Sequence, residues 1–198
     1  MTDITVQVNA VTDDARSYSD GWSFSTWSTT HYIWKIRVWW SQRDFWVWNR
    51  FTGVTIPQWA TIVSAMLDMY NATAWEWTTV EMKIVWNDVD DAVTYSTSNK
   101  PSDNVDTTAS LSVSVDVATF QTAQGFWNIL RDIKDIIQEI VNRAWWVSGK
   151  SIAIVCRDDW SADDSNISVS TEDRAAWRWM TLDITYTVWW VTRRIFVS

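Results

Sequence analysis

Apolar and polar residues alternate with a period of two along most of this 198-residue chain. In residues 4–11, for example, Ile4, Val6 and Val8 fall on one face. Such alternation is typical of half-buried β-strands. We expect further strands at residues 31–38, 44–51, 61–70, 78–86, 109–116, 151–157, 166–171, 180–188 and 191–197. Short strands separated by turn signals predict an all-β fold, an antiparallel, jelly-roll-like β-sandwich.

The same alternation predicts the core of the sandwich. We expect eight side chains to be largely buried: Ile62, Met66, Val80, Ile84, Ile152, Ile154, Leu182 and Ile184. Ile62 and Met66 occupy alternate positions and should face one core. The sequence contains neither an internal repeat nor a linker, so we expect a single domain over residues 1–198.

One segment has a helical period instead. Isoleucine and valine recur there at the spacing of one helical face, at Ile133, Ile136, Ile137, Ile140 and Val141. Asp132 is a suitable N-cap and Arg143 suits the carboxyl end of the helix dipole, so we expect a helix near residues 132–143. The polar residues 87–108 are expected to form a surface loop packed on the sheet.

The composition is unusual in two opposite ways. The chain has 19 Trp and 4 Gly, whereas average usage of about 7% would give about 14 Gly. Many of the tryptophans stand where turns favour glycine, namely Trp59, Trp75, Trp77, Trp145, Trp160, Trp177, Trp179, Trp189 and Trp190. Trp189 and Trp190, for example, separate two expected strands, where Gly-Gly or Asn-Gly is usual.

Two interpretations account for these tryptophans. In the first, they are true tryptophans on loop tips that stack on sugar rings or on a partner, as at Trp75, Trp77, Trp189 and Trp190. In the second, the printed Trp stands for Gly, because the codon UGA is translated as Trp in one genetic code and as Gly in another. UGA recoding explains both anomalies of composition. Trp146 and Trp127 would remain genuine.

Residues 50–72 resemble a known family. They are similar to the DNRLRE-type, carbohydrate-binding-module-like extracellular β-sandwich domains of bacteria and their phages, whose pattern has Arg-Phe, then Val-x-Ile-Pro-x-Gly-Ala-x-Ile, then Ser-Ala-x-Leu. Trp59 stands at the glycine of this pattern, and the matching residues are Arg50, Phe51, Val54, Ile56, Pro57, Ala60, Ile62, Ser64, Ala65 and Leu67.

The resemblance extends over most of residues 4–188. The segment 87–92 (NDVDDA) resembles the family after the next strand, and residues 136–155 resemble a helix-to-strand segment in which Trp145 again replaces a glycine. The resemblance implies the fold of the family and leaves the function open.

Charge and hydropathy exclude two classes of partner. The formal net charge is −8 and the sequence pI is about 4.5, so there is no basic stripe for a phosphate backbone and we expect no nucleic acid partner. No apolar run reaches the length of a membrane span, so we expect no membrane partner. The first residues lack the basic and apolar regions of a secretory signal.

Candidate catalytic groups are few, and we expect no enzyme. The single histidine, His31, begins an expected strand and is interpreted as a solvated or packing residue. The single cysteine, Cys156, lies in an apolar run and is interpreted as a buried, unreactive thiol. There is no zinc-type Cys/His cluster and no phosphate-binding loop.

The possible cofactor is a structural calcium ion. Asn87, Asp88, Asp90 and Asp91 place four oxygen-bearing side chains within five residues of a loop. Hard oxygen ligands on a flexible loop suit Ca²⁺, although the spacing is not that of an EF-hand. The alternative is that these are solvated acidic turn residues, with no cofactor.

We therefore expect a non-enzymatic virion structural protein of a bacteriophage, a capsid decoration (cement) or tail-accessory subunit. Its partners would be other virion proteins and copies of itself, and it would be assembled in the host cytoplasm and exposed on the particle exterior. The alternative is a carbohydrate-binding module of a cell-surface or receptor-binding protein, with a surface glycan as partner.

Overall fold

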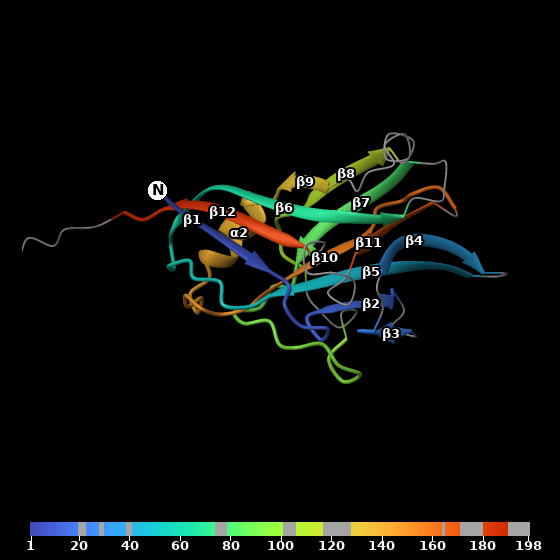
Figure 1. The fold of residues 1–198 in the computed structure, drawn as a ribbon, viewed down its shortest axis with the longest axis horizontal. Helices are drawn as coiled ribbons and strands as arrows, with labels where there is room; N and C mark the ends of the chain where they lie inside the picture. The colour runs from blue at the N-terminus through green and yellow to red at the C-terminus, as the bar shows by residue number, and fades with distance from the viewer. Residues whose placement is uncertain are drawn as a thin grey trace, which may run out of the picture.

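The computed structural model of this chain describes residues 1–19, 23–27, 30–38, 41–73, 79–100, 106–116, 128–163, 165–170 and 180–189. It confirms the expected class: the fold is all-β and sandwich-like, every strand pairing in it is antiparallel, and one short helix lies among the described residues (Figure 1).

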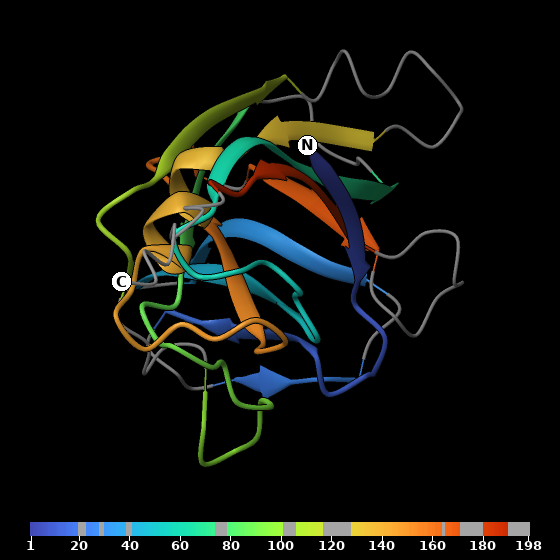
Figure 2. The same cartoon turned by 90° about the vertical axis from the view of Figure 1, so that its left-hand side faces the viewer.

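The strands form two layers. One layer has the order β1–β12–β6–β9, with β1 Thr2–Gln7, β12 Thr181–Thr187, β6 Thr61–Thr73 and β9 Asn128–Asp132. The other contains β2 Asp14–Tyr18, β3 Phe24–Ser25, β4 Thr30–Val38, β5 Ser41–Phe51, β7 Thr79–Trp86, β8 Leu111–Asp116, β10 Ile152–Asp158 and β11 Asn166–Ser170. The layers are joined where β11 pairs with the end of β6, so that one sheet order runs from β1 to β8. Figure 2 shows the two layers from the end of the sandwich at which α2 (Lys134–Val141) lies.

Seven of the eight expected core residues are buried, and Met66 is not. The register between β12 and β6 shifts so that Tyr186 pairs with Ile62 and Thr185 pairs with Ser64, which leaves Val63 as an extra residue. Such a β-bulge reverses which face the following side chains occupy. The buried residues of β6 after the bulge are therefore Ala65, Leu67 and Met69, and the prediction that Ile62 and Met66 share one core is wrong.

The amphipathic helix is confirmed, with a different start. Its isoleucine stripe is buried against the core, including Ile136, Ile137 and Ile140. Asp132 is not the N-cap, because the strand β9 ends there and Ile133 holds the cap position. The Asp132 carboxylate instead accepts backbone hydrogen bonds from Ala65 and Lys134, at 3.0 and 3.1 Å.

A second, smaller core lies on the outer face of the second layer. Trp48 of β5 packs there against Tyr95, with ring centroids 6.1 Å apart, and Ala92 completes the contact from the same loop. This confirms that the described part of residues 87–108 is a loop packed on the sheet. No helix of the described residues is long and apolar enough to cross a membrane.

Three described strands were not expected from the sequence. β2 (DARSY) and β3 are short and have no apolar alternation, and β9 directly precedes the helix. The strand expected at residues 191–197 lies outside the described residues.

Candidate functional site

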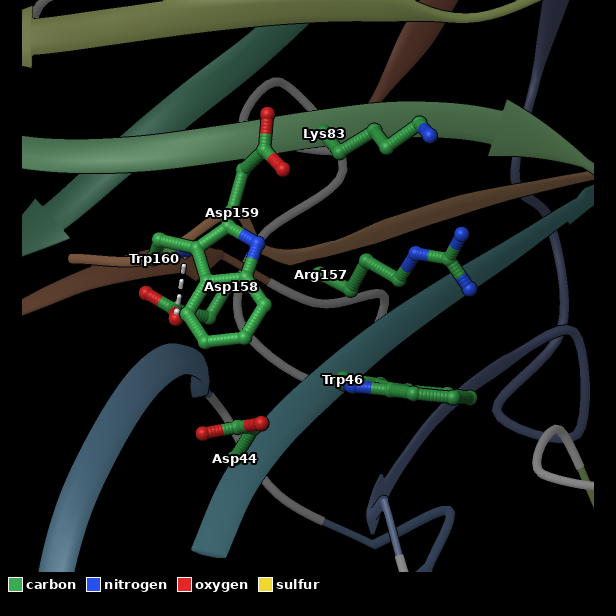
Figure 3. A pocket seen from close by; sticks show the side chains of 7 residues that line it. All are labelled: Asp44, Trp46, Lys83, Arg157, Asp158, Asp159 and Trp160. Carbon is green, nitrogen blue, oxygen red and sulfur yellow. Dashed lines mark hydrogen bonds between the residues drawn. The ribbon is translucent and has the colours of Figure 1, made fainter. Parts of the chain in front are cut away.

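An open cleft of about 480 Å³ lies on the outer face of the second layer (Figure 3). This volume is within the range of small-molecule sites. The cleft has two tryptophans, two cations and three carboxylates, supplied by Asp44, Trp46, Lys83, Arg157, Asp158, Asp159 and Trp160. A site that combines aromatic rings with hydrogen-bond donors and acceptors has the chemistry to bind a polyhydroxylated ligand.

Strand register brings the cations of the cleft together. Arg157 of β10 lies directly opposite Lys83 of β7, a like-charge pair that is unfavourable by itself. Arg157 offsets this by pairing with Asp106 and by stacking over the ring of Trp46, 5.3 Å from the ring centroid. Figure 3 shows Lys83 and Arg157 extending in the same direction, with Trp46 beneath Arg157.

The carboxylates of the cleft also have partners in the protein. Asp159 accepts a hydrogen bond from Ser112 Oγ at 2.7 Å. Asp158 accepts from the backbone N–H groups of Trp160 and Ser161, at 3.1 and 3.2 Å. Such a side-chain cap is typical of an Asx turn, and it shapes the loop that carries Trp160.

Trp160 is the most exposed ring of the cleft and has an unusual backbone. Its φ is +68° and 86% of its surface is exposed. Bulky residues rarely adopt positive φ, whereas glycine adopts it freely. The residue that would form a stacking platform therefore occupies a position suited to glycine.

Trp59 repeats this conformation. It is the third residue of a turn closed by a 3.2 Å hydrogen bond from Ala60 N–H to the Pro57 carbonyl, and its φ is +63°. Turns with positive φ at this position take glycine or asparagine. Among the described residues, Trp59 and Trp160 are the non-glycine residues at positive φ.

The connection between β4 and β5 is another place where tryptophan stands in a link that favours glycine. Val38 of β4 pairs with Ser41 of β5, so Trp39 and Trp40 alone link the two strands. Two-residue hairpin links strongly favour Asn-Gly or Gly-Gly, because one or both residues need positive φ. Neither tryptophan is among the described residues.

The other described tryptophans at expected glycine positions do not have positive φ. Trp145 and Trp189 are exposed, but neither has positive φ, so the backbone at these two positions does not require glycine. The C-cap residue Asn142 is itself right-handed, with φ −82°. Trp75, Trp77, Trp127, Trp177, Trp179 and Trp190 lie outside the described residues.

The buried tryptophans form a separate class. Trp48, Trp86 and Trp146 are each exposed by 1% or less. The indole N–H of Trp146 donates to the Ile56 carbonyl at 3.0 Å, which agrees with its interpretation as a genuine tryptophan. Those of Trp48 and Trp86 have no hydrogen-bond partner in the described part of the chain.

The loop proposed for calcium is held by an arginine. Asp88 and Asp90 both pair with the guanidinium of Arg143 at the end of the helix. These contacts raise the pKa of Arg143, the largest cause being its hydrogen bond to Asp90. The Asp91 carboxylate accepts a hydrogen bond from the Ser151 backbone N–H at 2.8 Å. Asn87 is buried, and its backbone forms an isolated β-bridge with Asp106. The described residues contain no group of three or more His, Cys, Asp or Glu side chains arranged to hold a metal ion.

Chelation is therefore expected to leave stability unchanged. The guanidinium of Arg143 already supplies positive charge to Asp88 and Asp90. The midpoint of urea unfolding should be the same in EDTA and in millimolar Ca²⁺. A midpoint that rises with Ca²⁺ would restore the calcium hypothesis, and Asp91→Asn would then show whether this loop binds the ion.

His31 and Cys156 are both buried, and Cys156 belongs to the main hydrophobic core. His31 is fully buried on β4, and neither ring nitrogen has a hydrogen-bond partner among the described residues. Burial, helped by the nearby charge of Arg16, lowers the pKa of His31 to about 3. Burial raises the pKa of the Cys156 thiol to about 12. The histidine is a packing residue and not a solvated one, and the thiol is buried as expected.

His31 should make the protein acid-sensitive. Its pKa is about 3 in the folded state and about 6.5 in the unfolded chain. The unfolded state therefore binds the extra proton between these values, and stability falls as pH drops below 6.5, by at most about 1.4 kcal/mol per pH unit. Urea unfolding of wild type and His31→Leu from pH 7 to pH 4 measures this. The variant should lose part of the pH slope, and equal slopes would contradict the assignment.

A scan against protein-family models and a search of curated proteins found no match to this chain. The cleft was not expected from the sequence, because Asp44, Trp46 and Lys83 lie far along the chain from the consecutive residues 157–160 that complete it. The signal that could have found it is the position of Lys83 and Arg157 on adjacent strands, which only the register reveals. Of the residues proposed for glycan stacking, the structure describes only Trp189, which is exposed and is not among the residues lining the cleft.

Proposed function

We propose that this protein is a non-enzymatic structural subunit of a bacteriophage virion, a capsid decoration or tail-accessory protein that contacts other virion proteins and copies of itself. The observation that carries the proposal is that ionisable side chains form ion pairs within the protein. Arg50 pairs with Asp13 at 2.5 Å, and Arg143 pairs with Asp88 and Asp90. Each pair joins segments far apart in the sequence, as a rigid scaffold requires.

Open sheet edges support an assembling role. Within the described residues, β1 and β8 end the sheet order and pair on one side only. Edge strands leave backbone groups available to another chain, so repeated subunits often associate through them. The resemblance to extracellular β-sandwich domains of bacteria and phages supports a position on the exterior of the particle.

Particle composition tests the proposal. Phage particles purified from an induced or infected culture of the source cells should contain peptides of this chain, in a constant ratio to the major capsid protein across a density gradient. Detection of the chain only in the particle-free fractions would contradict a virion role. The genes beside its own should encode capsid, portal or terminase proteins.

The cleft favours a second candidate function, a carbohydrate-binding module. It joins an exposed ring, Trp160, to carboxylates and to the cations Lys83 and Arg157. Because Arg157 covers one face of Trp46, Trp160 is the ring with the most accessible surface. The identity of residue 160 therefore separates the two functions: with glycine there, the cleft loses its stacking platform.

A glycan-binding protein should depend on this ring. If Trp160 binds sugar, Trp160→Ala should weaken binding to a surface polysaccharide of the host by at least about fivefold, in line with about 1–3 kcal/mol for a lost aromatic contact. Trp189→Ala is the matched control, since this equally exposed ring is not among the cleft residues. Calorimetric titration measures both. Equal affinities would remove the cleft from the glycan hypothesis.

A further inference from the structure

The cleft on the outer face of the second layer has its charges separated into two halves. Lys83 and Arg157 extend to one side of the cleft (Figure 3). The carboxylates Asp44, Asp158 and Asp159 lie on the other side. All five residues are partly exposed. One face of the protein therefore presents a basic surface and an acidic surface next to each other.

The basic half is only partly compensated within the chain. Lys83 and Arg157 lie directly opposite each other on β7 and β10, which is unfavourable for two like charges. Asp106 pairs with Arg157, whereas Lys83 forms no ion pair with any residue that the structure describes. This arrangement favours an additional carboxylate next to Lys83, supplied from outside the chain.

The acidic half contains a carboxylate that can meet this need. Both oxygens of Asp158 accept hydrogen bonds from backbone N–H groups of its own loop. Asp159 accepts one bond, from Ser112 Oγ at 2.7 Å, and the described residues offer no donor to its other oxygen. The backbone N–H of Asp159 donates to the Glu81 carbonyl at 2.8 Å, which fixes the residue beside β7. Asp159 is therefore a positioned carboxylate with capacity for a cation of another molecule.

A second copy of this chain compensates both halves at once. In a contact with two-fold symmetry, both copies present the same surface and every residue pair occurs twice. An axis that runs between the two halves places the basic half of each copy on the acidic half of the other. Lys83 of each copy then meets Asp159 of the other. A purely anionic partner would compensate Lys83 but would be repelled by the acidic half.

We infer that two copies of this protein associate through the outer-face cleft about a two-fold axis, with Lys83 of each copy paired to Asp159 of the other. The inference deepens the proposed function, because it names the surface through which copies of the subunit meet. It rests on that function only for the presence of several copies. It does not use the ring of Trp160, so it holds whether residue 160 is tryptophan or glycine.

Charge reversal in the full-length chain tests this contact. Lys83→Glu and Asp159→Lys should each weaken self-association by at least about tenfold in sedimentation equilibrium, because each change makes two attractive contacts of the dimer repulsive. Both changes in one chain should restore the affinity. Lys134→Glu is the matched control, since it alters the net charge equally at an exposed position of α2 outside the cleft, and it should leave the affinity unchanged.

A mixture of the two single variants gives the sharpest measurement. Each variant alone should be largely monomeric, and the mixture should form a heterodimer. In that heterodimer one contact keeps the original lysine–aspartate pair, and the other joins the two reversed charges. Far-UV circular dichroism checks that both variants are folded. If Asp159→Lys does not fold, Asp159→Asn, which keeps an acceptor for Ser112, should weaken self-association by at least about threefold.

Four results would overturn the inference. They are a monomeric wild-type chain, folded variants that associate like wild type, a mixture that stays monomeric, and oligomers that grow with concentration instead of closing as dimers. Particle composition separates this contact from the virion proposal. A monomeric chain that is present in purified particles contradicts the contact and leaves the virion role standing. A charge-dependent dimer that is absent from particles supports the contact and contradicts the virion role.

Discussion

The native protein is expected to have an intact mass below 23.1 kDa, the mass of the printed sequence. The difference should be a whole multiple of the Trp-to-Gly residue difference, and the multiple counts the recoded positions. Trp59 and Trp160 are the positions where the backbone most strongly favours glycine, with φ of +63° and +68°. Intact-mass spectrometry of protein from its own cells measures the total, and peptide mapping assigns each site. A mass of 23.1 kDa would defeat the recoding hypothesis.

Synthetic genes provide an independent test. Relative to the printed chain, Trp59→Gly and Trp160→Gly should each raise the free energy of unfolding by about 1 kcal/mol or more, because a non-glycine residue in the left-handed region is strained by about 1–3 kcal/mol. Trp146→Gly is the matched control. It should destabilise by about 3–5 kcal/mol or prevent folding, because it empties a fully buried site and leaves the Ile56 carbonyl without its indole donor. Destabilisation by all three variants would mean that the tryptophans are native.

Arg50→Leu should reduce the free energy of unfolding by about 3–5 kcal/mol, because it leaves a buried charge without its partner. Arg50 donates from Nε to the Ala92 carbonyl at 2.6 Å, from Nη1 to Asp13 at 2.5 Å and from Nη2 to Ser151 at 3.0 Å. The side chain of Asp13 is only 4% exposed. These bonds join the chain before β2, the loop after β7 and the start of β10. Urea unfolding measures the loss.

A double-mutant cycle separates the ion pair from packing. Arg50→Leu combined with Asp13→Leu removes both charges, so it should be more stable than Arg50→Leu alone. Arg50→Lys keeps the charge without the planar donor set and should fall between wild type and Arg50→Leu. A double variant as unstable as the sum of the two single variants would show that the two residues are not coupled.

Local pattern was enough to predict the class of the fold. Period-two alternation located the strands that later proved to be β4, β5, β7, β10 and β12, since a half-buried strand must alternate. The 3.6-residue period located the buried face of α2 for the same reason. The glycine-like character of Trp59 and Trp160 was also visible, because turn geometry is set by neighbours such as Pro57 and Asp158.

Long-range pairing decided everything that the local pattern could not. Because of one bulged residue in β6, Ala65 and Leu67 face the core and Met66 does not. No local pattern showed that β12 pairs with both β1 and β6, or that the Asp132 carboxylate accepts a hydrogen bond from the Ala65 backbone N–H across the sheet.

The candidate site followed the same rule. Lys83, Arg157 and Trp46 lie together because the strands β7, β10 and β5 are neighbours in the sheet. Asp88 and Asp90 form ion pairs with Arg143, which lies at a helix end distant in the sequence. Sequence by itself determined the elements that have a clear apolar period, since these depend on backbone geometry and on the burial of one face, whereas β2, β3 and β9 were found only in the structure. The partners of each polar side chain were decided only by the tertiary structure, because they come from segments that no local pattern connects.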